Sequence, residues 1–160
     1  MNNIKTFGNF KKQDIFVNII NNDIQSLKNY IDAGYDINKQ DNFGYTPLMY
    51  AIHNNKIAIV KLLLNVGADI DKQNNRGNTA LTVAAYNNNR EIVEILLDYG
   101  ADEFILNNKN KSFYDYLDDK NQQYFTQNYP TSVYNAINHE YKKSFTEFVK
   151  DYNIKIKKII

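Results

Sequence analysis

The chain has 160 residues, which suits a single domain or a short repeat array and leaves little room for a second full-sized domain. Leu, Ile, Val and Phe make up 45 residues and the formal net charge is only +1, so the composition favours a packed core over disorder. The absence of Cys excludes disulfides and thiolate chemistry, and the two His residues, His53 and His139, offer little for a metal site.

Neither a membrane span nor a cleavable signal is visible in the sequence. Charged residues interrupt every apolar run well before the roughly 18 residues that a membrane helix needs. The segment from Met1 to Thr6 has no apolar stretch of the signal-peptide kind. We therefore expect a cytoplasmic protein without a membrane span, or one that acts in the cytosol of a host if it is a secreted effector.

A repeat of 33 residues organises most of the chain. Residues 43–75 and 76–108 align without a gap, and residues 10–42 and 109–129 follow the same pattern less closely. The strongest matches between the two central copies are Thr46-Pro47-Leu48 over Thr79-Ala80-Leu81, Ala51 over Ala84, Ile59-Val60 over Ile92-Val93, Leu63-Leu64 over Leu96-Leu97, and Gly67-Ala68-Asp69 over Gly100-Ala101-Asp102. A fixed period of this length predicts a stack of similar supersecondary units.

Each central copy predicts, in chain order, a hairpin loop, a helix, a turn and a second helix. Gly44 fits the tip of the loop, and Thr46 can cap the first helix by accepting hydrogen bonds from backbone N–H groups of its first turn. Pro47 suits the first helical position, where its missing N–H would be unpaired anyway. Asn55 and Asn88 interrupt the apolar pattern where a turn is due, and Asn tolerates a positive φ.

The second helix of each central copy is predicted to bury apolar side chains at helical spacing. These are Ile57, Val60, Leu63 and Leu64 in one copy and Ile92, Val93, Leu96 and Leu97 in the next. Gly34, Gly67 and Gly100 fit the residue after the helix end, where a positive φ is common. The small Ala51 and Ala84 allow neighbouring helices to approach closely.

The two end copies depart from this pattern. In the first copy Asn18 stands where Ala51 would be, and in the last copy Asn110 replaces the hairpin Gly and Ser112-Phe113-Tyr114 replaces Thr-Pro-Leu. An end unit has only one neighbour, so its outer face must become polar or be covered. We interpret Asn18 as part of such a polar face.

Residues 130–160 form a separate segment outside the repeat. Apolar side chains at i, i+4 spacing predict an amphipathic helix over 131–152, followed by a Lys-rich tail. Its apolar stripe must be covered, either by the last repeat or by the same helix of a second chain. We favour the first arrangement and hence a monomer, with a homodimer through residues 131–152 as the alternative.

The period and the Thr-Pro-Leu motif resemble those of the ankyrin repeat, over about residues 10–129. The resemblance implies an all-α solenoid of helix-turn-helix pairs with projecting hairpin loops. It also implies a non-enzymatic module without a cofactor, which binds a partner protein through the hairpin tips and the first helices, together a concave face. An adaptor, an effector and an immunity protein all fit this description.

Family correspondence also implies which residues contact the partner. They flank the hairpin Gly or close the first helix: Phe43, Tyr45, His53, Asn54, Arg76, Asn78, Tyr86, Asn87, Lys109 and Lys111. Tyr and Arg are enriched among interface hot spots, so we expect Tyr45, Arg76 and Tyr86 to be central. The alternative is that Phe43 or Tyr86 packs against its own neighbouring repeat.

The sequence also offers two alternatives to protein binding. Residues 141–160 carry a net charge of +4, so the tail could bind nucleic acid or an anionic surface, although it has no Arg and no recognised nucleic-acid motif. A hydrolase would need two carboxyl groups facing one cleft, for which Asp118 with Asp119 or Asp14 with Asp23 are the candidates. No glycine-rich phosphate motif occurs, so we expect no nucleotide, and the absence of Cys with two widely separated His residues leads us to expect no metal.

Overall fold

A computed structural model describes residues 14–129 of the chain. The chain divides into two compact units, Met1–Leu117 and Asp118–Ile160, and each is described by itself. The amphipathic helix expected over 131–152 and the Lys-rich tail lie outside the described residues. Their roles in capping, self-association or nucleic-acid binding, and the division of the chain at residues 129 and 130, stay predictions.

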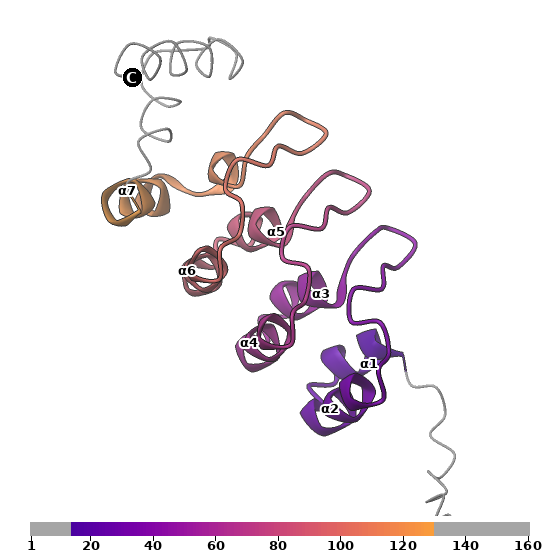
Figure 1. Cartoon of the computed structure of the whole chain (residues 1–160). Helices are drawn as coiled ribbons and strands as arrows, with labels where there is room; N and C mark the ends of the chain where they lie inside the picture. The colour runs from indigo at the N-terminus through magenta and orange to yellow at the C-terminus, as the bar shows by residue number, and fades with distance from the viewer. Residues whose placement is uncertain (1–13, 130–160) are drawn as a thin grey trace, which may run out of the picture. The chain divides into compact units, whose positions relative to one another are not determined.

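The described part of the first unit consists of helix pairs separated by projecting loops, as Figure 1 shows. Its elements are α1 (Ile15–Ile20), α2 (Ile24–Asp32), α3 (Pro47–His53), α4 (Ile57–Asn65), α5 (Ala80–Tyr86), α6 (Arg90–Asp98) and the short 3₁₀ helix η1 (Tyr114–Tyr116). Residues 14–129 contain no β-strand. The predicted all-α stack of paired helices is confirmed.

The pairs stack in chain order through their first helices. Helix α3 packs against α4 within its pair and against α1 and α5 of the neighbouring pairs, and α5 packs against η1. The long loops project on the side of α1, α3 and α5, away from α2, α4 and α6 (Figure 1). We term α1, α3, α5 and η1 the inner helices and α2, α4 and α6 the outer helices.

The helix boundaries follow the sequence predictions. Thr46 Oγ1 accepts a hydrogen bond from the N–H of Met49 at 3.2 Å, and Thr79 caps α5 in the same way at 3.3 Å. Pro47 is the first residue of α3. Asn55 and Asn88 have φ values of 54° and 53°, so both take the left-handed conformation that the turn between paired helices requires.

The core lies within and between the helix pairs, and most of the predicted side chains belong to it. Val60, Leu63 and Leu96, for example, are fully buried. The prediction was wrong for Ile57 and Leu97, which are only half-buried. Ile57 is the first residue of α4, with no preceding helical turn to cover it. Leu97 belongs to the last outer helix of the first unit, so no following outer helix of that unit covers it.

The position of Ala51 is buried in every pair, whichever residue occupies it. Ala51 and Ala84 are fully buried, as expected of small residues between close helices. Asn18 is 2% exposed, so the interpretation of Asn18 as part of a polar outer face was wrong. The reason is positional, because α1 packs against both α2 and α3 and this side of an inner helix faces the interior of the stack.

The last repeat keeps the core positions while losing the regular first helix. Phe113, Tyr114 and Leu117 are buried at the positions of Ala80, Leu81 and Ala84, although only η1 forms there. The second unit contributes α7 (Asp119–Asn128), which is capped by Asp118 through a hydrogen bond from the N–H of Asn121 at 2.8 Å.

Candidate functional site

Each hairpin loop is closed at its base by one side-chain oxygen that accepts two backbone hydrogen bonds. In the first loop, Asp41 Oδ1 accepts from the N–H groups of Phe43 at 2.9 Å and Tyr45 at 2.8 Å. Asn74 and Asn107 do the same in the next two loops. We term residues 42–45, 75–78 and 108–111 the hairpin tips. The shared closure gives the three tips the same local conformation.

Neighbouring loops are also bonded to one another. The N–H of Asn75 donates to the carbonyl of Phe43 at 3.1 Å, and the same bond recurs one repeat later at 3.0 Å. Gln40 Nε2 donates to the carbonyl of Gln73 at 3.0 Å, and Gln73 donates to the third loop at 3.1 Å. The tips are therefore held in register, so a partner would not have to order this backbone on binding.

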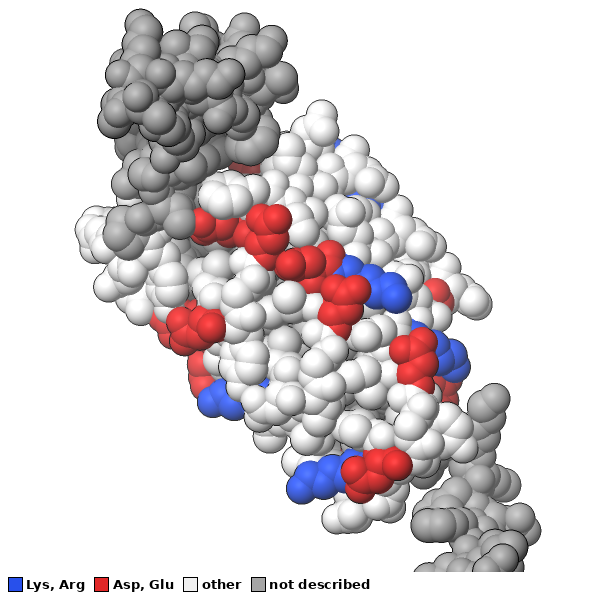
Figure 2. Space-filling view, in the orientation of Figure 1, with Lys and Arg blue, Asp and Glu red and all other residues white. Residues whose placement is uncertain are grey.

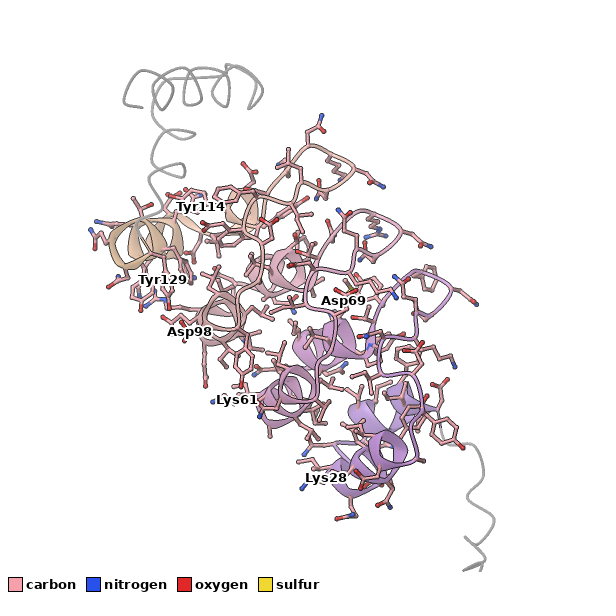
Figure 3. All side chains as sticks on the ribbon, viewed as in Figure 1. Lys28, Lys61, Asp69, Asp98, Tyr114 and Tyr129 are labelled. Atoms are coloured by element: carbon pink, nitrogen blue, oxygen red, sulfur yellow. The ribbon has the colours of Figure 1, made fainter. Side chains whose placement is uncertain are left out.

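A row of acidic side chains runs along the base of the loops. Figure 2 shows this row crossing the face in view, and Figure 3, in the same orientation, places Asp69 in it. The N–H of Asp69 donates to Asn38 Oδ1 at 2.8 Å, and the N–H of Asp102 donates to Asp71 Oδ1 at 2.9 Å. Side chains at the position of Asn38 and Asp71 thus join one repeat to the next.

Three of the four carboxylates considered for acid–base chemistry serve as helix caps, and the fourth, Asp119, is the first residue of α7. Asp23 accepts from the hydroxyl of Ser26 at 2.6 Å and from its N–H at 2.9 Å, and these bonds lower the pKa of Asp23. Asp14 and Asp118 cap α1 and α7. Within residues 14–129, no three His, Cys, Asp or Glu side chains gather as ligands of a metal ion would.

Most of the predicted partner-binding residues lie at the surface. Phe43 and Tyr86 have 71% and 72% of their surface exposed, so neither is buried against its neighbouring repeat, although one edge of Tyr86 contacts Tyr116 of that repeat. Tyr45, Asn54 and Asn78 are half-buried. The remaining exposed members of the set are His53, Arg76, Asn87, Lys109 and Lys111.

Three of the predicted residues meet in a cluster on the later repeats. The ring centroid of Tyr86 lies 5.9 Å from that of Tyr116, and Lys111 Nζ lies 5.5 Å from the centroid of the Tyr116 ring. Asn107 Nδ2 donates to Tyr116 Oη at 2.7 Å and to Asn78 Oδ1 at 2.8 Å. Tyr86, Lys111 and Asn78 are therefore positioned around one half-buried tyrosine.

Tyr45 belongs to a second cluster, on the first two helix pairs. Its ring meets that of Tyr50 edge to face at 6.1 Å, and the Tyr50 ring lies 4.6 Å from that of Phe16. The Tyr50 hydroxyl donates to Asp41 Oδ2 at 2.9 Å. The carboxylate that closes the first loop thus also fixes the central ring of this cluster.

The other predicted residues lie elsewhere in the repeats. His53 is the last residue of α3, and Asn54 and Asn87 are the C-cap residues of α3 and α5. Asn54 Nδ2 also donates to the carbonyl of Tyr50 at 2.8 Å, so the amide has a structural task at the helix end.

Sequence reasoning missed four side chains of the inner helices that belong to the same surface. The repeat register could have found Ile20, because a shift of 33 aligns it with His53 and Tyr86. It aligns Val17, Tyr50 and Tyr116 with Val83, which is buried, so it gives no such signal for these three. Val17 and Ile20 are 43% and 49% exposed, unusually open for aliphatic side chains of inner helices. The missed residues are Val17, Ile20, Tyr50 and Tyr116.

Asp41→Asn is expected to lower the pKa of Tyr50 while leaving the hairpin intact. Burial and then the hydrogen bond and charge of Asp41 raise this pKa above its ordinary value, whereas Asn already closes the other two loops. The raised pKa means that the folded state favours the neutral phenol of Tyr50. The environment of Tyr50 therefore stabilises the fold below about pH 10, the ordinary pKa of tyrosine, and this stabilisation is lost as the pH rises through the pKa of the folded state.

The measurement is an NMR titration of ring-labelled tyrosine, with Tyr50→Phe to assign the signal. The stability difference between wild type and Asp41→Asn should shrink on alkaline titration. An unchanged Tyr50 pKa in Asp41→Asn would show that burial alone causes the shift.

Comparison with known protein families identifies most of the repeat region. Residues 15–107 match the family model for ankyrin repeats, in three copies. No curated protein matches the chain at a significant level. Among residues 14–129, no helix has the length and apolar character needed to cross a membrane.

Proposed function

Because the chain belongs to the ankyrin-repeat family, whose members generally mediate protein–protein interactions, we propose that it binds a partner protein through its inner face. We define the inner face as the hairpin tips together with the exposed sides of the inner helices. It corresponds to the concave face that the family resemblance implies. On this proposal the chain acts as a binding module and carries out no reaction of its own.

The observation that carries the proposal is the exposure of Phe43 and Tyr86, at 71% and 72%, on a backbone that is already fixed. A solvated loop tip or helix end has no structural need for a large aromatic side chain. Aromatic side chains bury a large area for little loss of conformational freedom, which is why they are frequent among interface hot spots. The bonded row of loops supports the same conclusion, since an ordered surface loses little entropy on binding.

The test is the affinity of a captured partner for the variant Tyr45→Ala, Arg76→Ala, Tyr86→Ala. Truncating one hot spot typically costs about 2 kcal/mol, which is roughly thirtyfold in Kd, so the triple variant should bind at least that much more weakly. The matched control replaces Lys28, Lys61 and Asp98 of the outer helices by Ala (Figure 3). Circular dichroism establishes that both variants keep the fold.

An affinity that is unchanged in the inner-face variant, or that falls equally in the outer-helix control, would show that the interface lies elsewhere.

A further inference from the structure

The chemistry of the inner face changes along the stack. The first hairpin tip carries Phe43 and Tyr45, and the inner helices beside it expose Val17 and Ile20. The second and third tips carry Arg76, Lys109 and Lys111, all exposed. Aromatic and aliphatic side chains therefore dominate one end of the inner face, and the hairpin tips at the other end carry cations, of which Lys111 lies over the Tyr116 ring.

The positive charge of the later tips stands out against the rest of the stack. Residues 14–117 hold thirteen acidic and nine basic side chains, yet every charged residue of the three hairpin tips is a cation. Lys39, outside the tips, lies 4.0 Å from a carboxylate oxygen of Asp14. Within residues 14–129, no carboxylate lies within 4.0 Å of the charged groups of Arg76, Lys109 or Lys111, which leaves them available to a ligand.

Lys111 is also held in place before binding. Its ammonium group lies over the Tyr116 ring, whose hydroxyl accepts a hydrogen bond from Asn107. A cation positioned over an aromatic ring retains its charge toward solvent and loses less freedom when it pairs with an anion. Complementary charge at such a surface accelerates encounter and selects partners by sign.

We propose that the partner presents an acidic protein segment, with carboxylates that pair with Arg76, Lys109 and Lys111 and apolar side chains that cover Val17, Ile20 and Phe43. This inference rests on the proposed function and names the chemistry of its ligand. Nucleic acid fits less well, because the net acidic stack repels a phosphate backbone and the aliphatic end of the face offers it no complementary group.

The probe is a displayed library of random 12-residue peptides, selected on the full chain at low salt. Enriched peptides are expected to contain more Asp and Glu than the starting library, together with apolar residues. Their affinity, measured by fluorescence anisotropy, should fall about tenfold or more in Lys109→Glu, Lys111→Glu. The control Lys28→Glu, Lys61→Glu makes the same change in net charge on exposed outer-helix positions and should change affinity less than about twofold.

The alternative outcomes are distinguishable. Peptides that need Tyr86 but show no acidic enrichment would overturn the acidic partner and leave the inner face as the binding site. Two results with acidic peptides would count against the inner face itself: an equal loss of affinity in both charge-reversal variants, or normal binding to Tyr86→Ala. A selection without any enriched peptide would count against it too. A fluorescent single-stranded oligonucleotide that binds more tightly than every peptide, and is lost in Lys109→Glu, Lys111→Glu, would replace the acidic segment by nucleic acid.

Discussion

Leu96→Ala is expected to lower the free energy of unfolding by about 3 kcal/mol, within the range of roughly 2 to 5 kcal/mol for fully buried leucines. Leu96 is fully buried in α6, which packs against α5 of the same pair. The truncated side chain would leave a cavity where α6 meets its neighbours, in addition to losing the transfer free energy of the removed atoms. Urea unfolding followed by circular dichroism measures the change.

The adjacent residue in α6 supplies the control. Leu97 has the same side chain in the same helix but is only half-buried, so Leu97→Ala should cost about 1 kcal/mol. The comparison removes helix propensity from the result, because both substitutions replace Leu by Ala within one helix. Equal losses for the two variants would mean that the burial of Leu96 is not what stabilises the third pair.

The repeat register made most of the fold predictable from the sequence. Caps, turns and helix ends depend on neighbours within the same repeat, so the local sequence is enough to predict the roles of Thr46, Asn55 and their equivalents. Burial of Ile57, Leu97 and Asn18 could not be predicted in the same way. For Leu97 and Asn18 it depends on which elements lie beside each helix, and this changes at the ends of the stack, whereas Ile57 lacks a preceding helical turn to cover it.

The candidate site was only partly predictable for a related reason. Family correspondence points to positions that vary, which identified Phe43 and Tyr86 but passed over Tyr50 and Tyr116. These two occupy a position that is apolar and buried in the repeat between them, as Val83 shows at 5% exposure. A tyrosine there is only half-buried, because its longer side chain extends beyond the core and its hydroxyl bonds to a group at the base of the loop, Asp41 or Asn107.

Gly77→Ala is expected to lower the free energy of unfolding by about 3 kcal/mol, for two separate reasons. Gly77 has a φ of +74°, a conformation that costs an L-residue with a Cβ about 1 kcal/mol. A Cβ at this position would also lie 2.7 Å from the backbone N of Asn108 in the next loop, which a hydrogen bond to the carbonyl of Arg76 holds in place. Separating the two loops adds about 2 kcal/mol.

The control is Gly67→Ala, which isolates the backbone conformation from the contact between loops. Gly67 has a φ of +85° but no atom within 4 Å of an added Cβ, so this variant should lose only about 1 kcal/mol in the same urea titration.

The third loop supports the distinction, because Asn110 occupies the position of Gly77 with a φ of +56° and, within residues 14–129, no further hairpin loop follows it. Gly77→Asn should therefore remain costly although Asn tolerates this φ, whereas Gly67→Asn should be nearly neutral. Equal stabilities of the two Asn variants would show that φ alone requires glycine at the tip, and that the close approach of the loops imposes no further constraint.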